Sequence, residues 1–110
     1  MSETILTLGD TPNSDRYLAL GRAIARLCPV GFEEARLDAE LDADPPVRSL
    51  KWTAPDGTTG EIGVGPGAQT EIGDLLREIR TVMASQEGGQ SFRRATVTLR
   101  SGGRFQMDVA

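Results

Sequence analysis

The sequence predicts an α+β fold: a single domain in which two helices pack on one face of an antiparallel β-sheet, in the order α-β-β-β-α-β-β. Two patterns lead to this prediction. Apolar residues recur at helical spacing in residues 17–28 and 72–83, and they alternate with polar residues in residues 35–42, 47–53 and 94–109. A chain of 110 residues is long enough to bury one core without disulfides or metal.

The first 13 residues are expected to form an arm ahead of the domain, and the domain itself spans residues 14–110. Thr4–Leu8 is a candidate short strand within the arm. The sequence leaves open whether the arm is ordered.

The first helix is predicted to begin at Asn13 or Ser14, whose side chains cap helix N-termini, with Asp15 favourably placed in the first turn. Pro29 and Gly31 end it. One face of this helix is apolar and is expected to meet the core: Tyr17, Leu20, Ala23, Ile24, Leu27 and Cys28.

Three strands are predicted between the helices. The first is half-buried, with side chains in strict alternation: Ala35, Leu37, Ala39 and Leu41 inward, and Arg36, Asp38, Glu40 and Asp42 outward. The second spans Val47–Thr53, with Leu50 and Trp52 on one face, and we interpret Trp52 as a core or interface residue. A Pro55-Asp56-Gly57 turn leads to the third, Thr58–Val64, which its glycines weaken.

The strongest helical pattern lies in the second half of the chain. Its apolar stripe follows the i, i+3, i+4, i+7 spacing: Ile72, Leu75, Leu76, Ile79, Val82 and Met83. Gly65–Gly67 are expected to form the preceding loop, and Gly88-Gly89 to end the helix. Gly73 would then lie in the first turn, where its cost of about 1 kcal/mol relative to alanine is tolerated.

The chain closes with a β-hairpin whose register follows from one constraint: directly opposed residues of an antiparallel pair share a face. A two-residue glycine turn would oppose Arg100 and Phe105, which breaks that rule. A three-residue loop, Ser101–Gly103, removes the conflict. It produces three apolar pairs: Leu99 with Phe105, Val97 with Met107, and Ala95 with Val109. We therefore predict a type I turn followed by a bulge, with Gly103 in the left-handed conformation.

The residue types exclude several kinds of catalytic and metal site. The chain has no histidine, so serine–histidine and cysteine–histidine catalysis are ruled out, as are zinc sites of the Cys₄ and Cys₂His₂ types. The single cysteine, Cys28, lies on the first apolar stripe and is interpreted as a buried, inert thiol. Gly63–Gly67 is glycine-rich but lacks the GK[ST] ending of a phosphate-binding loop. We therefore expect no enzymatic activity, no cofactor and no structural metal.

Four carboxylates follow one another at alternate positions: Asp38, Glu40, Asp42 and Asp44. Side chains at i and i+2 of a strand project in parallel about 7 Å apart, whereas calcium ligands converge to within about 2.6 Å of the ion. A solvated sheet face is therefore preferred over a metal site. The net charge of −4 and the scattered aromatic residues also disfavour a nucleic-acid partner.

The N-terminal stretch MSETILTLGD lacks the basic region and the continuous apolar stretch of a signal peptide. No segment approaches the roughly 18 apolar residues that span a bilayer. We therefore expect a cytoplasmic protein without a membrane partner.

Two stretches resemble the YezG-like immunity protein family. In CPVGFEEARLDAEL, a helix-ending proline is followed by an aromatic residue, a charged pair and an alternating strand. SFRRATVTLRSGGRFQMDVA resembles the family's closing motif, with an aromatic residue, a strand, a glycine turn and a phenylalanine-centred last strand. With the central helix, the similarity covers most of residues 15–110, and its positions are Pro29, Phe32, Leu37, Phe92, Leu99, Gly103, Phe105 and Asp108. The resemblance implies an antitoxin that binds a cognate toxin, often a nuclease, and it carries over no catalytic residue.

Two functions of different classes fit these observations. The first, which the resemblance favours, is a non-enzymatic protein-binding module that acts as an immunity protein by covering the active site of a cognate toxin. The second is a homo-oligomeric domain that self-associates through its exposed sheet face or edge; a homodimer is also compatible with the first. If the toxin is a nuclease with a basic cleft, the outward carboxylates Asp38, Glu40 and Asp42 are candidate partner-binding residues.

Overall fold

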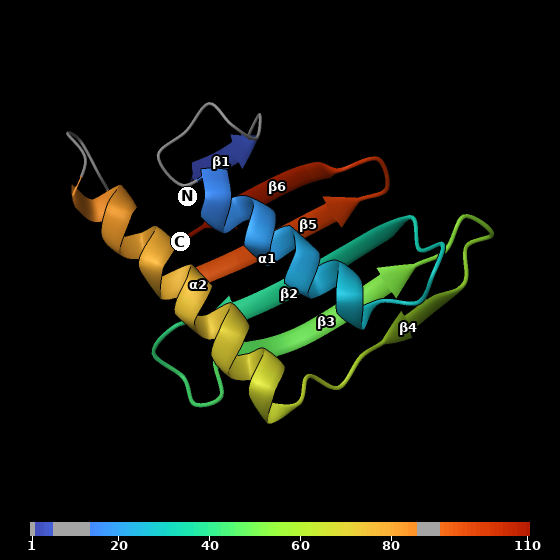
Figure 1. The fold of residues 1–110 in the computed structure, drawn as a ribbon, viewed down its shortest axis with the longest axis horizontal. Helices are drawn as coiled ribbons and strands as arrows, with labels where there is room; N and C mark the ends of the chain where they lie inside the picture. Colours follow the sequence, from blue (N-terminus) through green and yellow to red (C-terminus); the bar gives the residue numbers. More distant parts are fainter. Residues whose placement is uncertain (1, 6–13, 86–90) are drawn as a thin grey trace.

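A computed structural model describes residues 2–5, 14–85 and 91–110, with only the backbone described for residues 2–5 and 14. Its elements are β1 (Ser2–Ile5), α1 (Ser14–Leu27), β2 (Glu34–Glu40), β3 (Val47–Thr53), β4 (Thr59–Glu61), α2 (Pro66–Ser85), β5 (Arg94–Arg100) and β6 (Arg104–Val109). The strands form one antiparallel sheet in the order β1-β6-β5-β2-β3-β4. Both helices lie on the same face of this sheet and contact each other (Figure 1). From residue 14 onward the predicted α+β fold and element order are confirmed.

The core lies between the sheet and the two helices. The alternation predicted for the first strand is confirmed, because Ala35, Leu37, Ala39 and Leu41 are all buried. The apolar faces of both helices also enter the core, although Leu27, Cys28, Leu75 and Met83 are only partly buried at its border. The largest fully buried side chains come from six of the elements and from one residue before β5: Leu20, Ile24, Leu37, Leu50, Ile72, Leu76, Ile79, Phe92, Val97 and Met107.

The closing hairpin has the predicted register. Leu99 lies opposite Phe105, and the pairs of Val97 with Met107 and Ala95 with Val109 follow from it. The loop is Ser101–Gly103, and Gly103 has a positive φ, as predicted. The predicted type I turn is wrong, because Gly102 at the third turn position also has a positive φ, which a type I turn excludes and a type II turn requires.

The edge of the sheet formed by β3 and β4 is less regular than the sequence suggests. Strand β3 has the predicted bounds but contains a bulge, in which Arg48 is the extra residue between Val47 and Ser49. Strand β4 has three residues instead of the predicted seven. Trp52 lies opposite Gly60, and a Cβ at Gly60 would come within 2.6 Å of the indole ring. The half-buried indole therefore packs on the glycine backbone, in agreement with a structural role.

Helix α2 begins at Pro66, six residues before Ile72, so the predicted loop at Gly65–Gly67 is largely helical. Proline is well suited to the first helical position, because its missing N–H has no partner there in any case. Gly73 consequently lies in the helix interior and not in the first turn. A Cβ on Gly73 would sit 2.8 Å from Cγ of Pro46, so this glycine lets α2 approach the β2–β3 loop closely. The predicted end at Gly88-Gly89 lies outside the described residues.

Part of the expected N-terminal arm belongs to the sheet. Residues 2–5 form β1, which pairs with residues 106–109 of β6 along one edge. The predicted strand Thr4–Leu8 overlaps β1 in two residues, and its remaining residues lie outside the described part of the chain.

Candidate functional site

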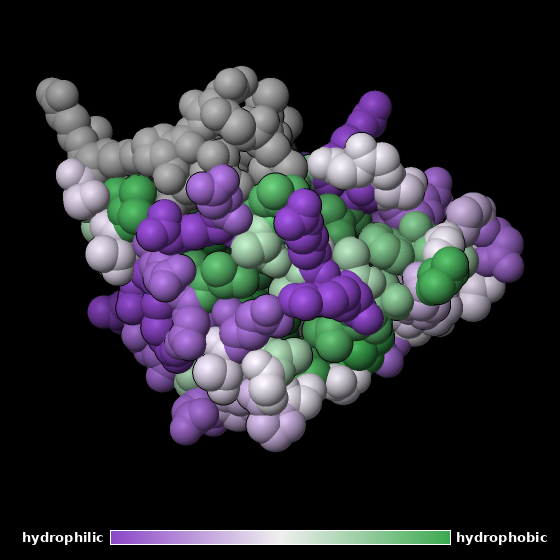
Figure 2. Space-filling view, in the orientation of Figure 1, coloured by the Kyte–Doolittle hydropathy of each residue, from purple (hydrophilic) through white to green (hydrophobic). Residues whose placement is uncertain are grey.

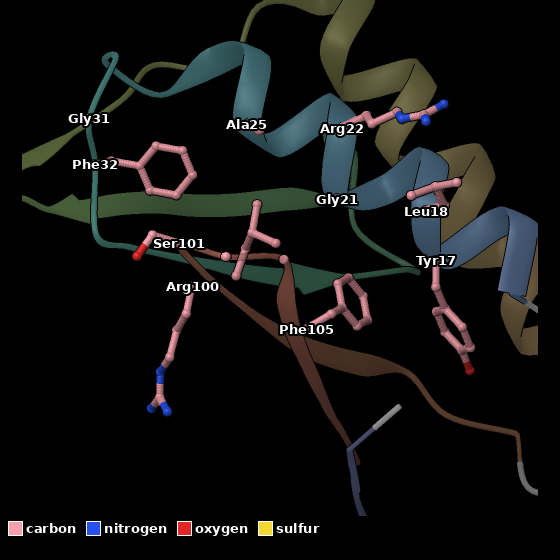
Figure 3. A pocket seen from close by; sticks show the side chains of 13 residues that line it. Tyr17, Leu18, Gly21, Arg22, Ala25, Gly31, Phe32, Arg100, Ser101 and Phe105 are labelled. Atoms are coloured by element: carbon pink, nitrogen blue, oxygen red, sulfur yellow. The ribbon is translucent and has the colours of Figure 1, made fainter. Parts of the chain in front are cut away.

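A pocket of about 350 Å³ lies between helix α1, the loop that follows it and the β5–β6 hairpin. Phe32 and Phe105 project into it from opposite sides, and Tyr17 flanks Phe105 (Figure 3). Apolar surface reaches solvent in this region, to the right of centre in Figure 2, between more hydrophilic side chains. The lining is largely hydrocarbon and backbone: Tyr17, Leu18, Gly21, Arg22, Ala25, Gly31, Phe32, Leu99, Arg100, Ser101, Gly102, Gly103 and Phe105.

The hollow exists because small residues line one flank of α1. Gly21 and Ala25 lie one helical turn apart and face the hairpin. A Cβ on Gly21 would be 3.8 Å from both Leu99 and Phe105, which is an ordinary contact distance. Beside them the Tyr17 and Phe105 rings pack with their centroids 5.5 Å apart, closing one end of the pocket.

The charged side chains at the pocket are cationic. Arg22 and Arg100 line it, and none of the described aspartates and glutamates does. The Nε atom of Arg100 donates to Oε1 of Glu34 at 3.0 Å. Arg22 is exposed and forms no ion pair within residues 2–5, 14–85 and 91–110. The pocket therefore combines an apolar interior with an available guanidinium at its rim, in a chain whose net charge is −4.

The candidate partner-binding carboxylates lie elsewhere, on and beyond the end of β2. Asp38 accepts hydrogen bonds from the hydroxyls of Thr96 (2.8 Å) and Ser49 (3.2 Å), and its Oδ1 is 3.9 Å from Nε of Arg36. Glu40 pairs with Arg94 at 3.5 Å.

Asp42 follows β2 in the next loop, so the three carboxylates do not share one strand. Its two oxygens are each 3.8 Å from an arginine, Arg80 of α2 and Arg93 before β5. We call Asp38, Glu40 and Asp42 the acidic strip. Each of these carboxylates has an arginine nitrogen of the same chain within 4 Å.

The helix-free face of the sheet is polar and charge-paired in the same way. The outward residues of β2 and β5 oppose acid to base, Glu34 to Arg100 and Glu40 to Arg94. Exposed pairs of this kind contribute little stability. The two exposed large apolar side chains among the described residues, Leu18 and Val30, lie on α1 and in the loop after it and not on this face.

The lone cysteine is partly buried at the end of α1, and burial raises the pKa of the Cys28 thiol above its usual 9.0. In the part of the chain that the structure describes, no three acidic or cysteine side chains gather as metal ligands would. Neither described helix is long and apolar enough to cross a membrane.

No model of a known protein family matches the chain, and no curated protein matches it. Four of the eight positions that carry the resemblance described above, namely Phe32, Leu99, Gly103 and Phe105, line the pocket. The pocket itself was missed in the sequence. In the sequence, the pocket is indicated only by the small residues Gly21 and Ala25 on the helix that carries Tyr17. These residues can be interpreted only when the position of α1 over the hairpin is known.

Proposed function

We propose that this protein is a non-enzymatic protein-binding module of the cytoplasm, acting as an immunity protein that neutralises a cognate toxin of the nuclease type by occlusion. One observation carries the binding role: a partly open apolar pocket framed by α1 and the closing hairpin. The resemblance supplies the kind of partner.

The composition of the pocket favours a protein side chain as its occupant. Its volume is at the lower end of the roughly 300–1,000 Å³ typical of small-molecule sites, which usually add several convergent polar groups. Here the lining is mainly apolar, and two aromatic rings, Phe32 and Phe105, form its walls. Sockets of this kind receive the buried apolar anchors that dominate protein–protein binding energy.

The position of the pocket supports the occlusion mechanism. It opens beside the exposed β5–β6 turn and the loop after α1, so a toxin held there by one anchor would also be covered by these loops. The nature of the anchored segment decides whether the toxin's active site itself is blocked.

Where a gene beside this protein's own encodes a toxin, the experiment is a growth assay in cells that produce that toxin. Wild type should restore growth, and Gly21→Leu, which places a branched side chain into the pocket, should fail while remaining folded by circular dichroism. Gly21→Ala is the matched control, because its Cβ meets Leu99 and Phe105 at ordinary distances.

A second variant keeps the test decisive if Gly21→Leu does not fold. Leu18 is 38% exposed at the rim, so Leu18→Lys should leave stability unchanged and still weaken protection. If folded wild type neither protects the cells nor binds the toxin in calorimetry, the immunity function is wrong. If both pocket variants protect as well as wild type, the pocket is not the binding site.

A further inference from the structure

Two large apolar side chains among the described residues are exposed: Val30, at 106% relative exposure, and Leu18, at 38%. Leu18 lines the pocket, and Val30 is not a lining residue but directly precedes two of them, Gly31 and Phe32. The N–H of Phe32 donates to the carbonyl of Pro29 at 3.3 Å. Val30 therefore stands at the tip of a hydrogen-bonded turn, projecting from the surface beside an apolar hollow.

Two charged side chains near the Val30 turn and the pocket, Arg22 and Glu33, have no ion-pair partner among the described residues. Most arginines in the described part of the chain have a carboxylate within 4 Å, but Arg22 has none. Glu33, next to the Val30 turn, is exposed and likewise has no ion-pair partner among those residues. Gly31 and Phe32 lie on one side of the pocket, and Leu18 and Arg22 on the other (Figure 3).

We infer that two copies of this chain form a two-fold dimer through this surface, with Val30 of each copy placed against Leu18 and into the pocket of the other. A two-fold contact uses the same patch twice, so the patch must carry both halves of each interaction. This one does: an apolar projection beside an apolar hollow, and the anion Glu33 on one side with the cation Arg22 on the other. In the dimer that we infer, Glu33 of one copy lies toward Arg22 of the other.

The contact has to extend beyond one side chain. Stable interfaces bury roughly 800 Å² of each partner, about an eighth of the 6405 Å² accessible surface of the chain. The exposed hairpin loop Ser101–Gly103 adjoins the pocket and is available to complete the area. The dimer covers the pocket, so a partner protein that binds in the pocket competes with the second copy. Dimerisation does not depend on the proposed immunity function.

The experiment is sedimentation equilibrium over a range of protein concentrations. Wild type should approach a mass twice 11.8 kDa. Val30→Ser should weaken dimerisation by roughly 100-fold or more, because two buried valine side chains are lost per dimer. Val30→Ile should leave the dimer intact. Wild type that stays monomeric up to about 1 mM, or a dimer that survives Val30→Ser, would overturn the inference.

Charge exchange tests the reciprocal geometry. Arg22→Glu and Glu33→Arg should each weaken the dimer, and the double variant should restore it, which a purely structural role of either residue does not predict. Arg48→Glu is the matched control, since Arg48 is exposed, lies on β3 and has no ion-pair partner in the described residues. Sedimentation of the chain alone involves no toxin, so failure of the dimer is measured separately from failure of the proposed function.

Discussion

The side chain of Gln69 on α2 occupies the edge of β3 at Val47. Its Oε1 accepts the Val47 N–H at 2.8 Å, and its Nε2 donates to the Val47 carbonyl at 3.0 Å. Strand β4 pairs only with residues 51–53 of β3, so the start of β3 would otherwise present unpaired backbone groups. Because exposed strand edges template the association of other chains, the amide of Gln69 limits edge-to-edge pairing at this point.

Gln69→Leu should therefore destabilise the protein by about 1–3 kcal/mol, since it leaves a partly buried N–H and carbonyl without partners. Urea denaturation gives the free energy of unfolding. Thr70→Ala is the control: Thr70 is exposed and its hydroxyl bonds only within its own helix, so a change below about 0.5 kcal/mol is expected. Equal losses in the two variants would contradict the capping role of Gln69.

Two glycines in helices should respond oppositely to alanine. Gly21→Ala should stabilise the protein by about 0.5–1 kcal/mol, because alanine favours the helix and its Cβ meets only ordinary contacts. Gly73→Ala gains the same helix propensity, but its Cβ would lie 2.8 Å from the rigid ring of Pro46. We expect Gly73→Ala to lower the unfolding free energy by about 1–2 kcal/mol net of that gain. Melting temperatures that shift in the same direction for both variants would show that α2 and Pro46 are further apart.

Phe105→Ala should cost about 3–5 kcal/mol, a large share of the stability of a small domain. Phe105 is 4% exposed, lies opposite Leu99 and packs on Tyr17. Arg104→Ala provides the control, because its exposed side chain neighbours Phe105 in sequence and points to the other face of the sheet. Chemical denaturation should show a loss of unfolding free energy several-fold larger for Phe105→Ala than for Arg104→Ala. Similar losses in the two variants would place Phe105 outside the core.

The Cys28 thiol should react slowly in the folded protein. Burial raises its pKa above 9.0, so less thiolate is present at pH 8 than for a free thiol. Alkylation by iodoacetamide should accelerate when urea unfolds the chain. The folded pKa is the higher one, so any stabilisation linked to this group is complete below about pH 9 and declines as pH rises through the folded pKa. A folded-state rate equal to the unfolded rate would show a fully accessible thiol.

Much of the fold follows from local pattern. The β5–β6 register could be predicted because Arg100 opposite Phe105 violates the rule that paired residues share a face. The start of α2 could not, because residues 66–71 are mostly polar or small and the apolar stripe begins only at Ile72, where the helix meets the core.

The candidate site was less predictable than the fold. Alternation placed Asp38 and Glu40 outward correctly, but their arginine neighbours come partly from β5, distant in sequence. The pocket depends on how α1 crosses the hairpin, which no short stretch encodes. Gly21 indicates a pocket only when the packing of α1 on the hairpin is known.

The acidic strip is tested by removing its charge while keeping its shape, in the triple variant Asp38→Asn, Glu40→Gln and Asp42→Asn. Each carboxylate lies within 4 Å of an arginine nitrogen, so its field is largely opposed within the protein, and we expect the folded variant to protect cells as wild type does. If the three carboxylates instead faced a basic cleft of the toxin, their charge would raise the association rate constant by about 10-fold or more at low salt. Slower association of the triple variant, measured by surface plasmon resonance, together with a wild-type affinity that falls as salt is added, would make the strip the binding surface and not the pocket.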